Sequence, residues 1–268
     1  MNKIHIDAYR LIEKIRKERP VIHHLTNWVT IYDCANIVKV FGASPVMAHA
    51  REEAAEMAGI ASSLVLNIGT LTPDLIDAMK VAAKAANKKD IPVILDVCGA
   101  GATSLRDKKS LELINEVRID VIKGNVSEIS RVAGDAVKTK GVDSGQVDKD
   151  MIEVAVSLAK KRKCTVVVTG KEDIVTDGKT VYIVKNGHSM MANIVGTGCM
   201  AASIIGTFAA VEIDLAYAAA AALVAFEVAA ELAAKDARGP GSFKEMLFDR
   251  AYALDAKTLE RMQRVECQ

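Results

Sequence analysis

A glycine-rich turn in the last third of the chain combines two features that are typical of phosphate chemistry. The segment Gly196-Thr197-Gly198-Cys199 follows an apolar run and opens a helix of small residues, predicted from Met200 to Val211. Backbone N–H groups at the start of a helix bind anions such as phosphate. Cys199 adds a thiol beside that position, so phosphoryl transfer is the first chemistry that the turn indicates.

The same turn has two other interpretations. Glycines often only tighten a strand-to-helix connection. The pattern Gly196-x-Gly198-x-x-Ala201 also fits the loosest dinucleotide-binding fingerprint. That fold, however, needs a strand after the helix and an acidic residue about 20 residues on, and this chain is predicted to stay helical almost to its end. The sequence Gly-x-x-x-x-Gly-Lys-Ser/Thr is absent, which excludes a P-loop NTPase. A nicotinamide-binding oxidoreductase and a catalytically silent binding or assembly protein stay open as alternatives.

The composition predicts one domain over residues 1–268. Half of the residues are hydrophobic (50%), and no linker, charge block or repeat interrupts the chain. The net charge of +1 and the 4% aromatic content, without a basic stripe, argue against nucleic acid as a partner. The one membrane-like stretch, Leu215 to Ala234, contains Glu227 and Glu231, which are costly in hydrocarbon. We therefore expect a buried or interfacial helix and no membrane.

The cysteines and the N-terminus predict a cytoplasmic protein. Five cysteines form neither a Cys-x-x-Cys pair nor an even disulfide framework, which is typical of a reducing compartment. The N-terminal segment is an amphipathic helix and lacks the apolar core of a signal peptide.

Short β-branched runs alternate with helical patterns, which predicts an α/β fold with a doubly wound, mostly parallel central sheet and helices on both faces. The predicted strands are 21–25, 63–68, 93–97, 121–123 and 165–169, followed by a hairpin of 174–176 and 181–184 closed by a two-residue Asp177-Gly178 turn. The predicted helices are 7–18, 30–41, 51–59, 73–87, 108–117, 126–134 and 148–162, then a helical group from 198 to near the end.

Ligands of open parallel sheets bind outside the carboxyl ends of the strands, and polar residues gather where these strands end. They are Asp96, Lys123, Asn125, Glu128 and Thr169, with a glycine-rich loop at 99–103. Each has a structural interpretation as a helix cap, a first-turn glutamate or a neutralising cation. Independent caps do not require acidic, basic and glycine residues to converge on one edge, so the joint pattern favours a binding site.

These segments resemble a known family. Asn125-Val126-Ser127-Glu128 is similar to the Asn-x-x-Glu motif of ribokinase-like kinases, and Gly196-Thr197-Gly198-Cys199 resembles their anion-hole turn, with cysteine in place of the usual aspartate. Within that superfamily, the cysteine form is similar to the hydroxyethylthiazole kinase family of thiamine salvage. Further similar segments lie in order along the chain: 24–27, 44–47, 67–70, 99–103, 140–144, 168–170, 186–188 and 239–243.

The resemblance implies an enzyme, a phosphotransferase with an alcohol group as acceptor, that uses ATP to phosphorylate 5-(2-hydroxyethyl)-4-methylthiazole. It places Cys199 at the catalytic-base position, within the anion-hole turn of Gly196, Thr197 and Gly198. Asn27, Met47 and Gly196 fall on thiazole-contacting positions. Lys123, Thr169 and Asn125 fall on the ATP side, and Asp96 and Glu128 on positions associated with Mg²⁺. The family forms homotrimers with sites between subunits. Within the kinase class, the alternative substrates are a hydroxymethylpyrimidine or a sugar.

Two positions depart from the family pattern. Val97-Cys98 replaces the usual Pro-Val pair after the strand-ending aspartate, which predicts a less rigid loop. Lys123 stands where arginine is common, so that a point charge replaces a bidentate fork. These changes bear on nucleotide affinity and leave the substrate class unchanged.

Overall fold

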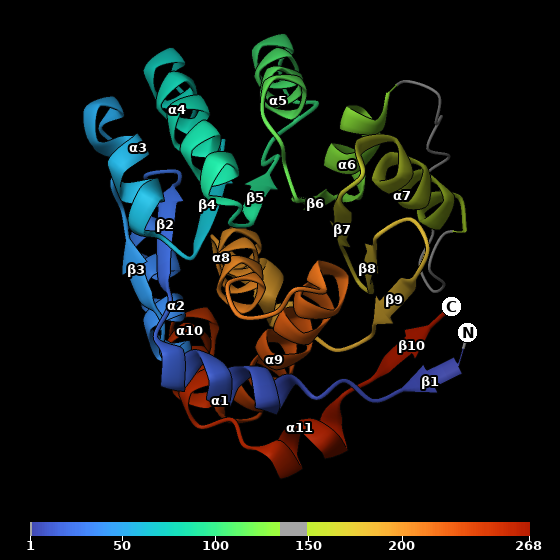
Figure 1. Ribbon diagram of the computed structural model, residues 1–268. Coiled ribbons are helices and arrows are strands. Elements are labelled where there is room, and N and C mark those ends of the chain that lie inside the picture. Colours follow the sequence, from blue (N-terminus) through green and yellow to red (C-terminus); the bar gives the residue numbers. More distant parts are fainter. Residues whose placement is uncertain (1, 135–148) are drawn as a thin grey trace.

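The computed structural model describes residues 2–134 and 149–268. In this part of the chain, ten strands form one sheet in the order β1-β10-β9-β8-β7-β6-β5-β4-β2-β3 (Figure 1). The strands β3, β2, β4, β5, β6 and β7 pair in parallel, and the remaining pairings are antiparallel. The strands are β1 Asn2–Ile4, β2 Val21–Leu25, β3 Ser44–Val46, β4 Ser63–Asn67, β5 Val93–Asp96, β6 Val121–Asn125, β7 Thr165–Thr169, β8 Asp173–Thr176, β9 Val181–Val184 and β10 Val265–Cys267.

Helices cover both faces of the sheet because successive strand residues alternate between two buried clusters. Val65 of β4 packs with the helices α1, α2, α8, α9 and α10, whereas Leu64 and Leu66 pack with α3 and α4 on the opposite face (Figure 1). The helices are α1 Ala8–Glu18, α2 Ile31–Phe41, α3 Arg51–Ile60, α4 Pro73–Lys89, α5 Ser104–Glu116, α6 Val126–Ala133, α7 Lys149–Arg162, α8 Thr197–Ala209, α9 Leu215–Asp236, α10 Pro240–Tyr252 and α11 Ala256–Met262.

The α/β class with a mostly parallel sheet is confirmed. The predicted strands β2 and β7 have their predicted bounds, β4 and β5 end one residue early, and β6 continues to Asn125. The three-residue strands β1, β3 and β10 were not predicted, because three residues are too few to show a pattern. Helix α5 begins at Ser104, earlier than the predicted residue 108, because the Thr103 hydroxyl caps its first turn.

The predicted two-residue hairpin turn is wrong. Thr176 pairs with Val181, which leaves a four-residue connection from Asp177 to Thr180. The Asp177 carboxylate accepts hydrogen bonds from the backbone N–H groups of Lys179 and Thr180, each at 2.8 Å, and Gly178 has φ +91°. The side chain of Asp177 therefore organises a longer loop than the Asp-Gly pair alone predicts. The similar segment at 140–144 and residue 148 of the predicted seventh helix lie outside the described residues.

Helix α9 is long and apolar enough to cross a membrane by length and composition, but most of it is buried inside the protein. Its alanines pack against α8 and α10 in the larger core cluster (Figure 1). The prediction of a buried helix is confirmed.

Helix α8 lies so close to the sheet that a side chain at Gly206 has no room. A Cβ atom there would clash with Cγ2 of Val65, and the Gly206 carbonyl accepts a hydrogen bond of 2.7 Å from Ser63 Oγ. We predict that Gly206→Ala lowers the free energy of unfolding by about 1–3 kcal/mol, the usual cost of overpacking, measured by urea denaturation.

The matched control is Gly59→Ala in α3, where a new Cβ meets nothing within 4 Å. This change is expected to leave stability equal or slightly higher, since alanine favours helices over glycine. A Gly206→Ala protein as stable as Gly59→Ala would contradict the close packing of α8.

Candidate functional site

A large cavity opens at the carboxyl ends of the parallel strands, beside the start of α8. Its volume of about 1190 Å³ exceeds the roughly 300–1,000 Å³ typical of a single small-molecule site. Residues that follow β2, β4, β5, β6 and β7 line it together with the turn before α8. The cavity therefore has room for two ligands side by side.

The turn before α8 depends on glycine. Gly196 has φ +99°, and a Cβ atom on it would lie 2.7 Å from Cγ2 of Thr30. Gly196 also offers no side-chain cap to the first turn of the helix. At Gly198, a Cβ atom would lie 3.1 Å from Nζ of Lys123. The two glycines thus bring the amino end of α8 up to the lysine, which suits an anion.

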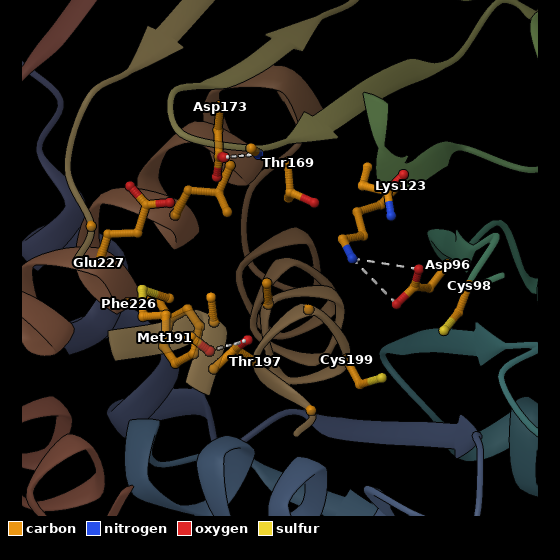
Figure 2. A pocket seen from close by; sticks show the side chains of 18 of the residues that line it. Asp96, Cys98, Lys123, Thr169, Asp173, Met191, Thr197, Cys199, Phe226 and Glu227 are labelled. Carbon is orange, nitrogen blue, oxygen red and sulfur yellow. Dashed lines mark hydrogen bonds and ion pairs between the residues drawn. The ribbon is translucent and has the colours of Figure 1, made fainter. Parts of the chain in front are cut away.

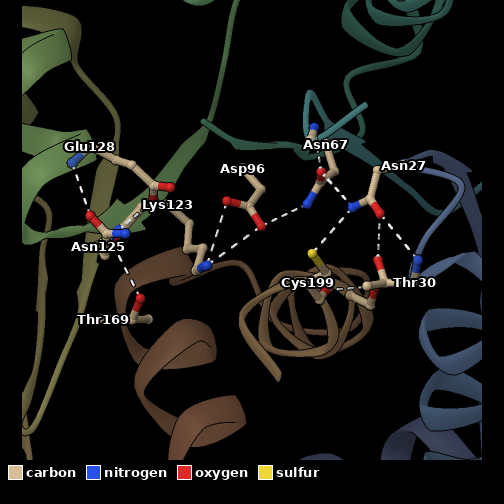
Figure 3. Close-up of polar contacts among 12 residues, drawn as sticks. Asn27, Thr30, Asn67, Asp96, Lys123, Asn125, Glu128, Thr169 and Cys199 are labelled. Carbon is tan, nitrogen blue, oxygen red and sulfur yellow. Dashed lines mark hydrogen bonds and ion pairs between the residues drawn. The ribbon is translucent and has the colours of Figure 1, made fainter. Parts of the chain in front are cut away.

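A row of polar side chains crosses the strand ends because the register places them side by side. Asn67 of β4 pairs with Asp96 of β5, which pairs with Lys123 of β6. Asn67 Nδ2 donates to Asp96 Oδ2 at 2.8 Å, and Lys123 Nζ lies 3.5 Å from both Asp96 oxygens (Figure 3). Burial raises the pKa of Asp96, while Lys123 acts against that shift. Burial would lower the pKa of Lys123, but Asp96 and Glu128 raise it above its ordinary value.

Cys199 lies at the end of this row. Asn27 Nδ2 donates to Cys199 Sγ at 3.2 Å and to Asn67 Oδ1 at 2.9 Å, while Asn27 Oδ1 accepts from the backbone N–H and the hydroxyl of Thr30 (Figure 3). A hydrogen bond from the Cys98 thiol lowers the pKa of Cys199 to about 5; burial opposes this shift, and Asn27 and Lys123 add to it. These contacts favour the thiolate form of Cys199.

Glu128 and Asn125 form a capping box at the start of α6. Asn125 Oδ1 accepts from the Glu128 N–H at 3.0 Å, and Glu128 Oε2 accepts from the Asn125 N–H at 2.7 Å. Glu128 Oε1 accepts in addition from the N–H of Gly99 at 2.7 Å. The capping interpretation of Asn125 is confirmed. Glu128 is buried and lines the cavity, so it is not the solvated first-turn glutamate of the alternative interpretation.

Ten of the eleven residues singled out from the sequence line this cavity. They are Asn27, Asp96, Lys123, Asn125, Glu128, Thr169, Gly196, Thr197, Gly198 and Cys199. Met47 does not line it; it is half-buried after β3, and its carbonyl contacts the ring of His49. The position of Met47 therefore does not support a contact with a substrate bound in the cavity of its own subunit.

Sequence reasoning missed Thr30, Asn67, Cys98, Asp173 and Glu227 as members of the site. Asn67 was visible only as part of a family segment, Cys98 only as a departure from the family pattern, and Thr30 carried no signal. Glu227 was noted as an acid within an apolar helix. A single acid among apolar residues was the feature from which a functional role could have been predicted. Only the fold shows that Asp173 and Glu227 line the same cavity (Figure 2).

The fold is ribokinase-like. A ribokinase-like superfamily protein from Enterococcus faecalis shares the fold with a TM-score of 0.66 at 13% identity, covering 94% of this chain and 99% of that one. The profile described as "HK: Hydroxyethylthiazole kinase family" matches residues 12–257. The chain belongs to the hydroxyethylthiazole kinase family.

Named relatives agree with this assignment. A hydroxyethylthiazole kinase from Methanosarcina mazei is 54% identical over 255 residues, 95% of this chain and 98% of the relative. One from Thermoanaerobacter pseudethanolicus is 48% identical over 258 residues, 96% of this chain and 98% of the relative. The structure of the hydroxyethylthiazole kinase protein from Pyrococcus horikoshii has a TM-score of 0.90 at 37% identity, covering 97% of this chain and 98% of that one.

The low pKa of Cys199 has a direct test. Because the thiolate is the reactive form, the rate of Cys199 alkylation by iodoacetamide should stay nearly constant from about pH 6 to 8.5 and fall only as the pH approaches 5. Peptide mass spectrometry measures the rate at each cysteine. Burial raises the pKa of Cys34 and Cys164 to about 12, so both should stay unmodified. A Cys199 rate that rises tenfold per pH unit through this range would contradict the assignment.

Proposed function

We propose that this protein transfers the γ-phosphoryl group of ATP to the hydroxyl of 5-(2-hydroxyethyl)-4-methylthiazole, in thiamine biosynthesis or salvage. Membership of the family and the names of the relatives support this substrate. The observation that carries the chemistry is the amino end of α8, where Cys199 and Lys123 lie beside glycines that leave room for phosphate.

Positioning and charge neutralisation account for most of the catalysis in phosphoryl transfer. The N–H groups from Gly196 to Cys199 would hold the γ-phosphate, and the Lys123 ammonium would balance its charge. Thr169 and Asn125 lie next to Lys123 along the strand ends, on the path that the rest of the nucleotide would follow (Figure 3). The acceptor alcohol would then lie near Asn27 and Cys199, in line with the phosphate.

Cys199 acts mainly as an orienting group in this proposal. A thiolate with a pKa of about 5 accepts a proton only weakly from an alcohol. A loose transition state needs little deprotonation of the hydroxyl before the phosphoryl group moves. The thiolate therefore accepts a hydrogen bond from the substrate hydroxyl and takes its proton late.

Mg²⁺ fits the charges of the cavity as a partner of ATP. Among the described residues no three His, Cys, Asp or Glu side chains form a metal-binding group, and both Glu128 oxygens accept from backbone N–H groups. Asp96 and Glu128 would therefore act on the ion through its waters. When bound, the ion would neutralise phosphate charge that Lys123 alone leaves unbalanced.

A homotrimer with sites between subunits, in the cytoplasm, completes the proposal. Apolar side chains stand exposed around the cavity mouth, with Val29 at 67% and Val195 at 71% exposure, beside Trp28 and Tyr32. A second copy that covers them would bury this surface. Met47 would then contact the substrate of a neighbouring subunit.

An assay of ADP formation with a panel of alcohols tests the function. We expect Mg-ATP and the thiazole alcohol to give ADP at a rate far above that with hydroxymethylpyrimidine or sugars, and chelation of Mg²⁺ to abolish it. Equal or greater turnover of a pyrimidine or a sugar would overturn the thiazole assignment. A thermal shift with NAD(P) and none with Mg-ATP would favour the oxidoreductase alternative.

Replacement of Cys199 separates its possible roles. Cys199→Ala should lower thiazole-dependent ADP formation by about 10²- to 10⁴-fold if the thiolate takes the proton, with the lower end expected for a mainly orienting group. Cys164→Ala, a buried cysteine remote from the cavity, is the matched control for loss of a thiol. An unchanged rate in Cys199→Ala would remove this residue from the chemistry.

A further inference from the structure

A second group of acids lies in the cavity, away from Cys199. Asp173 begins β8 and Glu227 lies in the middle of α9, with exposures of only 3% and 6% (Figure 2). The two carboxyl groups lie close enough for each to shift the pKa of the other. Asp173 Oδ1 also accepts from the N–H of Gly170 at 2.9 Å. The proposed chemistry at Cys199 and Lys123 uses neither acid.

One oxygen of this pair has no partner. Glu227 Oε2 is buried and accepts no hydrogen bond within residues 2–134 and 149–268. Glu231, one turn further along α9, shows the contrast: Arg264, Asn186 and the N–H of Gly187 all donate to it. Buried acceptors in proteins are almost always paired. Glu227 lines the cavity, so a donor on a bound ligand can approach its carboxyl group and complete its hydrogen bonding.

The charges around the pair favour a neutral donor over a strong cation. Burial raises the pKa of Glu227 well above its ordinary value, and Asp173 raises it further. Burial also raises the pKa of Asp173, against the attraction of Lys123. Glu231 raises the pKa of Glu227 further, whereas Arg264 lowers it. Two adjacent carboxyls in such a site hold one proton between them, so the pair has about one negative charge.

The walls beside the pair suit a flat ring. Met191, Val195, Leu223 and Phe226 also line the cavity, and Figure 2 shows Phe226 and Met191 near Glu227. Thr169 lies on the way from Lys123 to Asp173 in the same view. A planar heterocycle attached to a phosphate chain at the turn before α8 would therefore pack on these side chains with its edge toward the acids.

We propose that Asp173 and Glu227 recognise the nucleobase of the phosphoryl donor, with the Glu227 carboxyl group accepting a hydrogen bond from the exocyclic amino group of adenine. This inference rests on the proposed function, because it assumes that the nucleotide phosphates lie at the turn before α8. The pair then determines nucleotide specificity and takes no part in the transfer step.

The test compares ATP with purine riboside 5′-triphosphate, which lacks only the amino group. The wild-type protein should prefer ATP in kcat/KM by roughly 10- to 100-fold, the effect of one hydrogen bond to a charged acceptor. In Glu227→Ala the preference should fall to within about threefold. The fall in kcat/KM of Glu227→Ala with ATP should come from a higher KM for ATP, while kcat and the KM for the thiazole alcohol stay nearly unchanged. Asp173→Asn, which keeps the shape of the pair, should weaken the preference in the same direction.

Glu231→Gln is the matched control, because it alters an acid on the same helix that has hydrogen-bond partners and does not itself line the cavity; it should keep the preference for ATP. Titration calorimetry with ADP and purine riboside diphosphate gives the same comparison without turnover, so failure of the thiazole assignment would not obscure it. Equal use and equal binding of the two nucleotides by the wild-type protein would overturn the inference. So would a preference that persists in Glu227→Ala, or a change confined to the KM for the thiazole alcohol.

Discussion

The ion pair between Lys123 and Asp96 is the constraint on which the rest of the site depends. Both groups are almost completely buried, and a buried charge is costly unless it is paired and hydrogen-bonded. The register of β5 and β6 places the two residues opposite each other, and Asn67 of β4 donates to the same carboxylate. The parallel pairing thus builds the charged floor of the cavity. This floor faces the cavity in which we propose that the phosphate groups bind.

The thiolate of Cys199 extends the same network rather than forming a separate centre. Asn27 connects its sulfur to Asn67, and through Asn67 to Asp96. The Cys98 thiol stabilises the charged form, so the departure from the family pattern at 98 has a chemical consequence in this chain. A network of fully partnered side chains holds the sulfur in one place, which suits orientation of a substrate hydroxyl more than strong basicity. The unpaired oxygen of Glu227 is the contrasting case within the same cavity.

Close packing of α8 connects the core to this chemistry. Gly206 lets the helix lie against Val65, and Gly196 and Gly198 let its first turn approach Thr30 and Lys123. A larger residue at any of the three would move the helix or its neighbours. The close packing of α8 on the sheet and the approach of its first turn to the cavity therefore both depend on glycine.

The sequence by itself determined the α/β class, the main parallel strands and ten cavity residues, because buried strands have a strong local pattern and polar residues after parallel strands must share one edge. The short edge strands and the four-residue hairpin loop depend on pairing with distant partners, which no local pattern encodes. Only the tertiary structure decided that Asp173 and Glu227 meet, because they come from a strand and a helix separated by more than one element. It also decided the low pKa of Cys199, because that shift arises from residues 98, 27 and 123 brought together by the fold.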